Sequence, residues 1–313
     1  MDTKNVLTAI VLSTIIIVGW QVLVVDPEIK KEQALIEKTV QTKPAAEKPS
    51  APSLNRRIQL QEQKMSRQEA LVTDQRVKLD NAKITGSISL VGALIDDVTL
   101  KNYQESLDEN SKQVVILNPK KINKGYYLES GWASANNIDV PDNNSVWKLT
   151  KNKTLTPRTP IELEWDNQNG LVFTKKIEID DQYLFSITES IKNNSKGTVD
   201  LFHYSQITRK EKPQIQDFYI LHEGLVGVID ETLQEEDYDD VKDKNQKYQG
   251  TSGWLGITDK YWLTAIVPQK KQAFNAEFIY DTAYKANYIL TNPTSIPSGK
   301  INSSSSQFFI GAK

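Results

Sequence analysis

The fold-deciding stretch covers residues 171–191: LVFTKKIEI (171–179), then Asp180-Asp181-Gln182, then YLFSITESI (183–191). Side chains alternate between the two faces of a strand, so apolar residues at alternate positions predict strands with one buried face. The apolar positions are Phe173, Ile177 and Ile179 in the first half, and Tyr183, Phe185, Ile187 and Ile191 in the second. Lys175 interrupts the first series and is expected to be exposed. Asp180-Asp181-Gln182 favours a turn, so the stretch predicts a β-hairpin.

Similar stretches fill the chain from about Gln75 to its end. Apolar, β-branched and aromatic residues alternate, and no strong helical period follows residue 80. The sequence therefore predicts a mainly β fold, with one large β-sandwich over residues 67–313 rather than two small domains. The stretches expected as strands, broken in the first by Gly86 and Gly92, are RVKLDNAKITGSISLVGALIDDVTLKNY (76–103), TVDLFHYSQIT (198–208), KYWLTAIVP (260–268), AFNAEFIYD (273–281) and SQFFIGA (306–312).

The first 25 residues have a different character. An uncharged run extends from Asn5 to Val25, and a helix over it would measure about 31 Å, roughly the thickness of a bilayer core. A cleaved signal peptide would have a shorter apolar core and a small-residue cleavage site, which this run lacks. A buried core helix would need a comparable partner helix. We therefore favour a transmembrane anchor over 1–25, with the signal peptide and the core helix as alternatives.

Residues 26–66 resemble a flexible linker. They are rich in Lys, Glu, Gln, Ala and Pro and have few large apolar side chains to offset their ordering entropy. A charged linker is usually solvated, and attraction to anionic lipid headgroups is the alternative interpretation. At its end, SRQEALVTD (66–74) offers a Ser cap with Glu69 three residues later, which predicts a short helix.

Charge and cysteine content indicate where the β domain lies. Lys4 and the amino terminus precede the run, whereas four acids and three bases follow it between Asp26 and Lys38. This small bias favours a cytoplasmic N-terminus and an exported β domain. The absence of cysteine fits an oxidising compartment and leaves the hydrophobic core to stabilise the domain. The net charge of −2 argues against nucleic acid as a partner.

The sequence contains few candidates for chemistry. His203 and His222 are the only histidines and are interpreted as structural rather than metal-binding. The pairs Asp96-Asp97 and Asp180-Asp181 are assigned to turns, because neighbours in a strand point to opposite faces and do not converge. No nucleophile motif or phosphate-binding glycine loop occurs, and Ser303–Ser306 is interpreted as a loop. We therefore expect no catalytic, cofactor-binding or metal-binding residue, and no enzyme activity.

Two surface features leave alternatives open. The aromatic residues Tyr126-Tyr127, Trp132 and Trp165 suit a core better than a sugar-binding face. The acidic stretch 230–247 suggests a solvated excursion between strands, with a partner-docking loop as the alternative. On these observations the domain is either a docking module for a membrane machine or a carbohydrate-acting sandwich whose acid/base pair is not apparent.

Four stretches together resemble the YidC membrane protein insertase family, in the Gram-negative and alphaproteobacterial form. The first helix ends in Gly19-Trp20-Gln21, and Arg76-Val77-Lys78-Leu79 is followed by GSISLVGALIDDVTLKNY (86–103). The remaining two are FYILHEG (218–224) and the most specific stretch, GWLGITDKYWLTAIVP (253–268). Their order and spacing cover residues 1–313, so the resemblance extends over the whole chain.

The resemblance implies a periplasmic β-sandwich of the supersandwich type, held at the bacterial inner membrane by one N-terminal helix. It also implies a role in inserting and helping to fold integral inner-membrane proteins, alone or with the Sec translocon. The implied partners are nascent inner-membrane proteins, Sec components and the lipid bilayer. In the family, insertion depends on five further transmembrane helices that form a groove with a basic residue. This sequence stops before them, so it is expected to be a fragment without insertase activity of its own.

Overall fold

The computed structural model describes residues 65–108, 110–213 and 222–313. The predicted anchor over 1–25 lies outside the described residues, as does the predicted linker over 26–66 except for its last two residues. The described part contains two short helices, α3 (Arg67–Thr73) and α4 (Tyr238–Asp243). Among these described helices, neither is long and apolar enough to cross a membrane.

Helix α3 begins as its sequence predicts. The Ser66 hydroxyl accepts a hydrogen bond from the Glu69 amide at 3.3 Å, and the Glu69 carboxylate accepts one from the Ser66 amide at 2.8 Å. This reciprocal capping box satisfies two amide donors that the first turn leaves free. The predicted short helix near residues 66–74 is thus confirmed.

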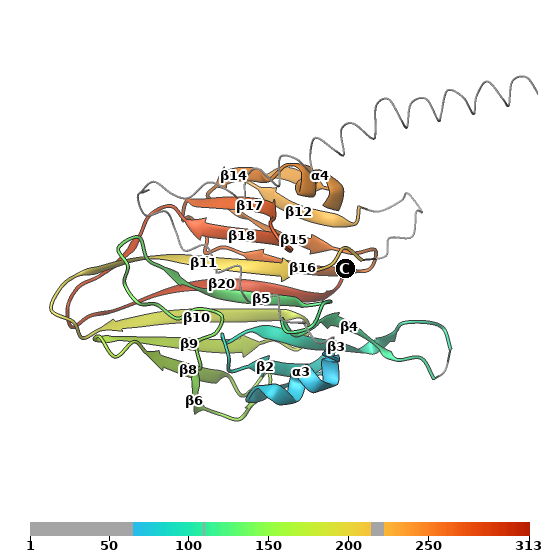
Figure 1. The fold of residues 1–313 in the computed structure, drawn as a ribbon, viewed down its shortest axis with the longest axis horizontal. Helices are drawn as coiled ribbons and strands as arrows, with labels where there is room; N and C mark the ends of the chain where they lie inside the picture. The colour runs from blue at the N-terminus through green and yellow to red at the C-terminus, as the bar shows by residue number, and fades with distance from the viewer. Residues whose placement is uncertain (1–64, 109, 214–221) are drawn as a thin grey trace, which may run out of the picture. The chain divides into compact units, whose positions relative to one another are not determined.

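The strands form two sheets (Figure 1), and the predicted mainly β sandwich is confirmed. The larger sheet has eleven strands in the order β14-β17-β18-β11-β5-β3-β2-β1-β7, with β19 paired to β11 and β4 paired to β3. Its strands are β1 (Arg76–Asp80), β2 (Ile84–Ser89), β3 (Ile95–Gln104), β4 (Gln113–Leu117), β5 (Tyr126–Ala133), β7 (Thr154–Leu155), β11 (Val199–Arg209), β14 (Gln246–Gly250), β17 (Phe274–Tyr280), β18 (Tyr284–Leu290) and β19 (Thr294–Ile296).

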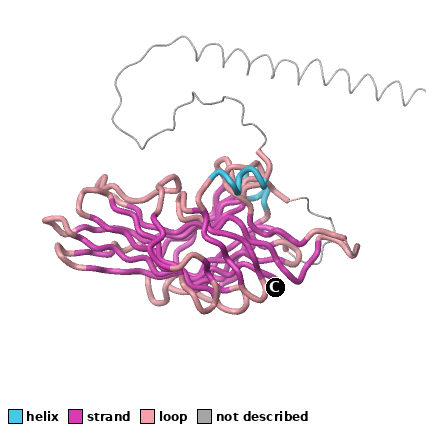
Figure 2. The backbone as a smooth tube through the Cα atoms, turned by 90° about the horizontal axis from the view of Figure 1, so that it is seen from below, coloured by secondary structure: helices cyan, strands magenta, loops and turns pink. Residues whose placement is uncertain are grey.

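The smaller sheet has nine strands in the order β13-β12-β15-β16-β20-β10-β9-β8-β6. Figure 2 shows strands running lengthwise through the body of the domain. The strands of this sheet are β6 (Lys148–Lys151), β8 (Ile161–Asp166), β9 (Leu171–Ile179), β10 (Leu184–Asn193), β12 (Gly224–Ile229), β13 (Thr232–Glu236), β15 (Gly253–Thr258), β16 (Trp262–Val267) and β20 (Ile301–Ala312). The interpretation of Ser303–Ser306 as a loop is wrong, because these serines lie in β20 and pair with β10.

The predicted hairpin over 171–191 is present as β9 and β10. The register pairs Ile179 with Phe185 and Ile177 with Ile187, and Asp180 lies in the turn as expected. The Asp180 carboxylate accepts hydrogen bonds from the amides of Gln182 and Leu184 at 2.8 and 3.0 Å. Such bonds from an Asp side chain to following amides stabilise a tight turn.

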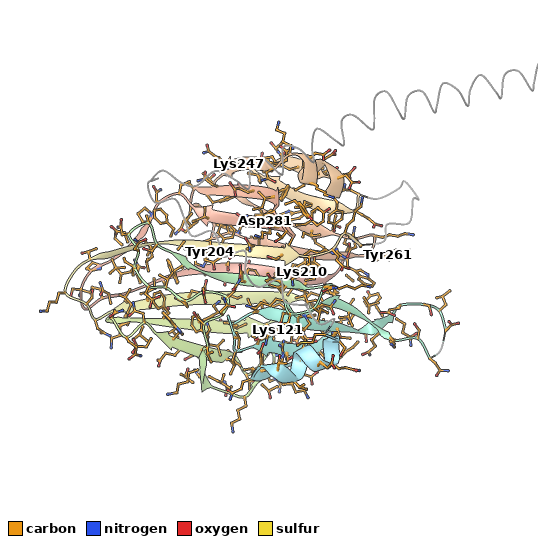
Figure 3. The ribbon with its side chains drawn as sticks, viewed as in Figure 1. Lys121, Tyr204, Lys210, Lys247, Tyr261 and Asp281 are labelled. Atoms are coloured by element: carbon orange, nitrogen blue, oxygen red, sulfur yellow. The ribbon has the colours of Figure 1, made fainter. Side chains whose placement is uncertain are left out.

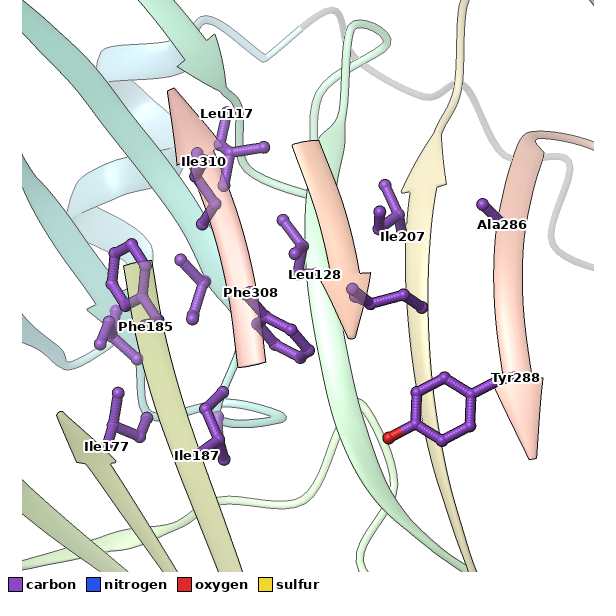
Figure 4. Packing of buried hydrophobic residues seen from close by; sticks show 14 of the residues in the cluster. Leu117, Leu128, Ile177, Phe185, Ile187, Ile207, Ala286, Tyr288, Phe308 and Ile310 are labelled. Atoms are coloured by element: carbon purple, nitrogen blue, oxygen red, sulfur yellow. The ribbon is translucent and has the colours of Figure 1, made fainter. Parts of the chain in front are cut away.

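The core lies between the two sheets. Figure 4 shows Ile177, Phe185 and Phe308 of the smaller sheet near Leu128 and Ile207 of the larger one, and all five are at most 1% exposed. Burial of such a side chain contributes roughly 1.5–3 kcal/mol. One continuous cluster of this kind stabilises the domain without any disulfide.

The stretch GWLGITDKYWLTAIVP forms β15, a turn and β16. Gly253 opens it with φ +122°, and a Cβ there would lie 1.8 Å from the carbonyl oxygen of Val228 on β12. Only glycine fits this approach between neighbouring strands. At the turn, the Asp259 amide donates to the Trp262 carbonyl at 2.9 Å.

The prediction that residues 230–247 form a solvated excursion holds for their exposure, since most of these side chains are exposed, but the stretch has regular structure and two buried residues. The stretch contains β13, which pairs with β12, then α4 and the start of β14. Tyr238 and Val241 of α4 are 1% and 0% exposed, and the Tyr238 ring meets the Tyr284 ring edge-on at 4.7 Å. A helix of this length gives only one i, i+3 apolar pair, which is too little to reveal a helical period.

Candidate functional site

A gap in the larger sheet positions the most unusual side chains of the domain. Strand β5 pairs with β11 from Tyr126 to Ala133, but on its other side it pairs with β3 only at Leu128, opposite Ile95. Beyond Leu128, the carbonyl groups on that side of β5 have no neighbouring strand in the described register. Buried carbonyls need another donor in such a place.

Lys175 supplies that donor. Its Nζ donates to the Ser130 carbonyl of β5 at 2.8 Å and lies 3.1 Å from a carboxylate oxygen of Glu189. The residue is 1% exposed, so the expectation that Lys175 is exposed is wrong. Lys175 lies directly opposite Glu189 in the hairpin register, and both side chains point to the core face of the smaller sheet. Their opposite charges and the free carbonyl together make burial of the ammonium tolerable.

His203 completes the buried charged cluster, by which we mean Lys175, Glu189 and His203. The His203 Nε2 lies 2.7 Å from the second carboxylate oxygen of Glu189, although β11 and β10 belong to different sheets. Burial of Glu189 opposes its ionisation, but the Lys175 ammonium and the His203 ring outweigh burial and lower the Glu189 pKa to about 2. The carboxylate is therefore ionised at neutral pH and holds the two sheets together.

Three buried polar atoms next to this cluster have no hydrogen-bond partner among the described residues: Ser130 Oγ, Trp132 Nε1 and Trp147 Nε1. All three residues, together with Glu129 and Glu189, line a small pocket. The centre of a water molecule can move within a volume of ≈ 10 Å³ in it. A polar cavity of about that size holds a single water. The space is too small for a sugar.

The residues considered for a sugar-binding face do not gather on one surface. Tyr126 and Trp132 of β5 are 4% and 2% exposed, and Tyr127 between them points to the opposite face of the strand. Trp165 lies on β8 of the other sheet and packs against Phe173 with a ring separation of 5.7 Å. These aromatic residues are parts of the core and its edges, in agreement with the interpretation that they suit a core better than a sugar-binding face.

The two histidines are far apart in role as well as in sequence. His203 is buried in the charged cluster, as expected of a structural histidine. His222 Nε2 lies 3.0 Å from the Leu225 carbonyl, a local contact at the start of β12. Within the described ranges, no three His, Cys, Asp or Glu side chains gather closely enough to hold a metal ion.

The assignment of Asp96-Asp97 to a turn is wrong. Both lie in β3, are 2% and 6% exposed, and form ion pairs, Asp96 with Arg76 and Asp97 with Arg67. The register shifts here, because Ser87 pairs with Asp97 while Ile88 pairs with Ile95, which leaves Asp96 as the extra residue of a bulge. A bulge breaks the strict alternation of side chains, so adjacent carboxylates can both be buried.

An open groove is lined by residues of β4, the start of β5, the end of β11 and the turn between β15 and β16. Its volume is ≈ 590 Å³, and its walls include Val114, Ile116, Tyr126 and Trp262. Arg209 also lines it and donates to Asp259 at 2.7 Å and to the Tyr238 hydroxyl at 3.1 Å. Arg209 also lies 4.6 Å from the centre of the Tyr126 ring. Burial opposes the charge of Arg209, but Tyr238 and Asp259 outweigh it and raise the pKa.

Sequence reasoning missed Glu189, Arg209, Arg67 and Arg76. One signal was available for the first: Glu189 breaks the apolar series of β10 at the position that faces Lys175, and it carries the opposite charge. No comparable signal exists for Arg209, because Asp259 is its partner only through tertiary packing. Of the resemblance motifs, residues 218–221 lie outside the described part of the chain.

Solved structures share the fold. A galactose mutarotase related enzyme from Lactobacillus acidophilus aligns with a TM-score of 0.51 and 10% identity, covering 75% of this chain and 97% of that one. A galactose mutarotase-like protein from Lactobacillus casei aligns with a TM-score of 0.50 and 6% identity, over 75% and 100%. Identities this low show the fold alone. They support the supersandwich-type architecture.

Relatives in sequence point to one family. A protein named membrane protein insertase YidC from Pelagibacter ubique is 40% identical, over 100% of this chain and 55% of its own length. A protein of the same name from Rickettsia bellii is 39% identical, over 88% and 48%. The chain thus spans about half the length of these curated relatives. Residues 76–313 match the family described as the YidC periplasmic domain, and the chain therefore belongs to the YidC membrane protein insertase family.

Proposed function

We propose that this chain supplies the anchor and periplasmic domain of a protein that inserts and helps to fold integral membrane proteins. The observation that carries the proposal is the 40% identity to a named insertase across the whole chain. The described residues also offer no assembled catalytic constellation: the buried carboxylates are bound in ion pairs or hydrogen bonds, as the contacts of Glu189 and Asp96 illustrate. The domain acts as a binding and supporting module rather than as an enzyme.

The proposed organisation keeps the three segments that the sequence predicts. Residues 1–25 anchor the chain in the inner membrane, and the N-terminus lies in the cytoplasm. Residues 26–66 connect this anchor to residues 67–313, which fold in the periplasm. The chain has no cysteine, so single cysteines at Asp2 and at Lys196 report the topology directly. A membrane-impermeant maleimide added to spheroplasts should label Lys196→Cys and not Asp2→Cys. The opposite pattern would reverse the topology.

The proposed partners are nascent inner-membrane proteins, the Sec translocon and the lipid bilayer. A photo-crosslinking residue placed at Lys124, which lines the open groove, compared with one at Lys196 in the turn after β10, tests the protein partners in membranes. Adducts with Sec components or clients at one position support a docking surface. Their absence at both positions would remove the docking role of this domain.

Growth rescue tests the function itself. In cells depleted of their own insertase, we expect no rescue by residues 1–313 alone. We expect rescue when the chain is fused to the part of the Pelagibacter ubique relative that it does not match. Growth supported by the chain alone, or by neither protein when both accumulate, would contradict the proposal.

The carbohydrate-acting alternative is not favoured. The similarity to mutarotase-related proteins is one of fold and gives no evidence for a sugar-binding site in this chain. The pocket beside Glu189 has room for about one water. We expect no mutarotase activity from the chain, as measured by the change in optical rotation of a freshly dissolved aldose. Turnover that disappears in Glu129→Gln, at the buried carboxylate on the outer face of β5, would revive the alternative.

A further inference from the structure

Exposed aromatic residues gather at one end of the domain. Tyr261 and Tyr103 are 56% and 40% exposed, and Leu107, on the loop between β3 and β4, is fully exposed. We call these three residues and Trp262 the aromatic end. Figure 3 places Tyr261 at the side of the molecule where Figure 1 marks the last residue. Single exposed apolar residues need no explanation, but a cluster of them does.

The three rings of the aromatic end contact one another across the two sheets. The Tyr103 ring, at the end of β3, meets the Trp262 ring of β16 edge-on at 5.1 Å. Tyr261 lies 6.0 Å from the same ring, and its carbonyl accepts a hydrogen bond from the Lys313 amide at 3.1 Å. These ring contacts restrict the side chains and reduce the ordering entropy that they would lose on binding.

The chemistry of this end fits the interface of a bilayer. Tyrosine and tryptophan combine an apolar ring with a polar tip and are enriched at the headgroup level of membranes. Lys260, whose Nζ lies 5.1 Å above the Tyr261 ring, has the same combination of apolar stem and charged head. A soluble protein partner would be expected to bury a larger apolar patch than these four residues offer.

Charge on the segments that form this end is nearly balanced. By sequence, the described residues of these segments carry two acids, Glu105 and Asp108, and three lysines, Lys112, Lys260 and Lys313. Asp259 is neutralised by Arg209. Attraction to anionic headgroups therefore contributes little, and contact with lipid should depend on the aromatic rings and on Leu107 rather than on salt.

A short connection between the apolar run and the domain would allow even a weak contact with lipid to orient the domain. Residues 26–64 connect the uncharged run Asn5–Val25 to the described domain. If these residues form the linker proposed above, a random coil of their length would have an end-to-end distance of roughly 35 Å and would give the domain a high effective concentration near the bilayer. Four interfacial side chains are then enough to bias its orientation.

We propose that the aromatic end docks on the bilayer interface, with Leu107 in the headgroup region beside Tyr103, Tyr261 and Trp262. The proposal rests on the proposed membrane anchoring of the chain. It fixes which end of the domain faces the lipid and directs the opposite end, with the β10–β11 turn, into the aqueous periplasm.

Nitroxide labels on single cysteines in the full chain test the proposal in phosphatidylcholine nanodiscs. The positions are Leu107→Cys and Lys260→Cys, with Lys196→Cys as the control. Lys196 follows β10, whose other end lies at the aromatic end, so it lies about 33 Å away. We expect the ratio of oxygen to nickel-chelate accessibility to be severalfold higher at 107 and 260 than at 196, and unchanged between low and high salt.

Two variants assign the effect to the rings. Tyr103→Ser/Tyr261→Ser should make the label at 107 as water-accessible as the label at 196. Leu233→Ser should not, because Leu233 is equally exposed at 56% but lies on β13. Equal water accessibility at 107, 260 and 196 in a chain that is bound to the nanodisc would overturn docking alone. A chain that does not associate with nanodiscs at all would overturn both anchoring and docking.

Discussion

The two faces of the β9–β10 hairpin each carry a Lys–Glu pair, and the two pairs lie in opposite surroundings. On the inner face, Lys175 and Glu189 lie 3.1 Å apart and their side chains are 1% and 3% exposed. On the outer face, Lys176 and Glu178 lie 2.8 Å apart with side chains 39% and 44% exposed. The distances are similar, so any difference in their contributions to stability arises from water and from the free carbonyl of β5. The inner pair joins β9 to β10 and contacts the larger sheet through Ser130 and His203, whereas the outer pair lies along β9 alone.

The largest effect should come from breaking the inner pair. Glu189→Ala leaves the Lys175 ammonium buried without its counter-ion, and such changes lower the free energy of unfolding by about 3–5 kcal/mol. Urea unfolding followed by tryptophan fluorescence measures this change. Lys175→Met/Glu189→Gln should be less destabilised than Glu189→Ala, because Gln still accepts from His203 and no charge is stranded. Equal destabilisation of the two variants would mean that charge burial is not the cause.

Acid should act on the inner pair as well. The Glu189 pKa is about 2 in the folded state, below its ordinary value of 4.5. An acid with a lowered folded pKa contributes stability above its unfolded pKa, and this contribution is lost as the pH falls from about 4.5 towards 2. Lys175→Met/Glu189→Gln should lose less stability than the parent over this pH range. Parallel pH profiles of the two proteins would assign the acid sensitivity to other groups.

A smaller effect is expected at the Arg76–Asp96 pair. Burial raises the Asp96 pKa, so Asp96 can take up a proton when Arg76 is replaced, and Arg76→Met should cost about 2–3 kcal/mol at neutral pH. Without Arg76, the folded pKa rises further above the unfolded one. The folded variant then holds more protons, and its deficit relative to the parent should shrink as the pH falls from 7 to 5. Thermal melts at both pH values check this, and a deficit that grows on acidification would contradict it.

The smallest effect is expected on the outer face of β9. Lys176→Met removes a solvent-exposed ion pair, and such pairs contribute about 0–1 kcal/mol. The adjacent Lys175→Met is its matched comparison, since the two substitutions are chemically identical and one residue apart. Urea midpoints for the two variants should differ clearly, with Lys176→Met close to the parent. Similar midpoints would remove the distinction between the two faces.

The sequence predicted what depends on local pattern. The hairpin over 171–191, the capping box at Ser66 and the mainly β class follow from alternation and turn residues, and the structure confirms them. What it missed depends on contacts between distant segments. Lys175 is buried because Ser130, 45 residues earlier, presents a carbonyl. Asp96 is buried because a bulge, invisible in the residue pattern, shifts the register of β2 against β3.

The candidate site was predictable only in part. The interpretation of His203 as a structural rather than a metal-binding residue agrees with its burial next to Glu189. The groove at Arg209 and Asp259 was not predictable, because its walls come from strands that are up to 148 residues apart in the chain, from Val114 to Trp262. Pairings over such separations are set by the packing of whole sheets and leave no short-range pattern in the sequence.

We assign the buried charged cluster a purely structural role, which is to stabilise the contact between the two sheets. One measurement tests this role directly. Lys175→Met/Glu189→Gln is introduced into the fusion with the unmatched part of the Pelagibacter ubique relative and assayed for growth in insertase-depleted cells. Circular dichroism of the purified protein confirms folding. We predict rescue as complete as that of the parent fusion. A folded, membrane-inserted variant that fails to support growth would contradict the account, because the cluster would then take part in the activity itself.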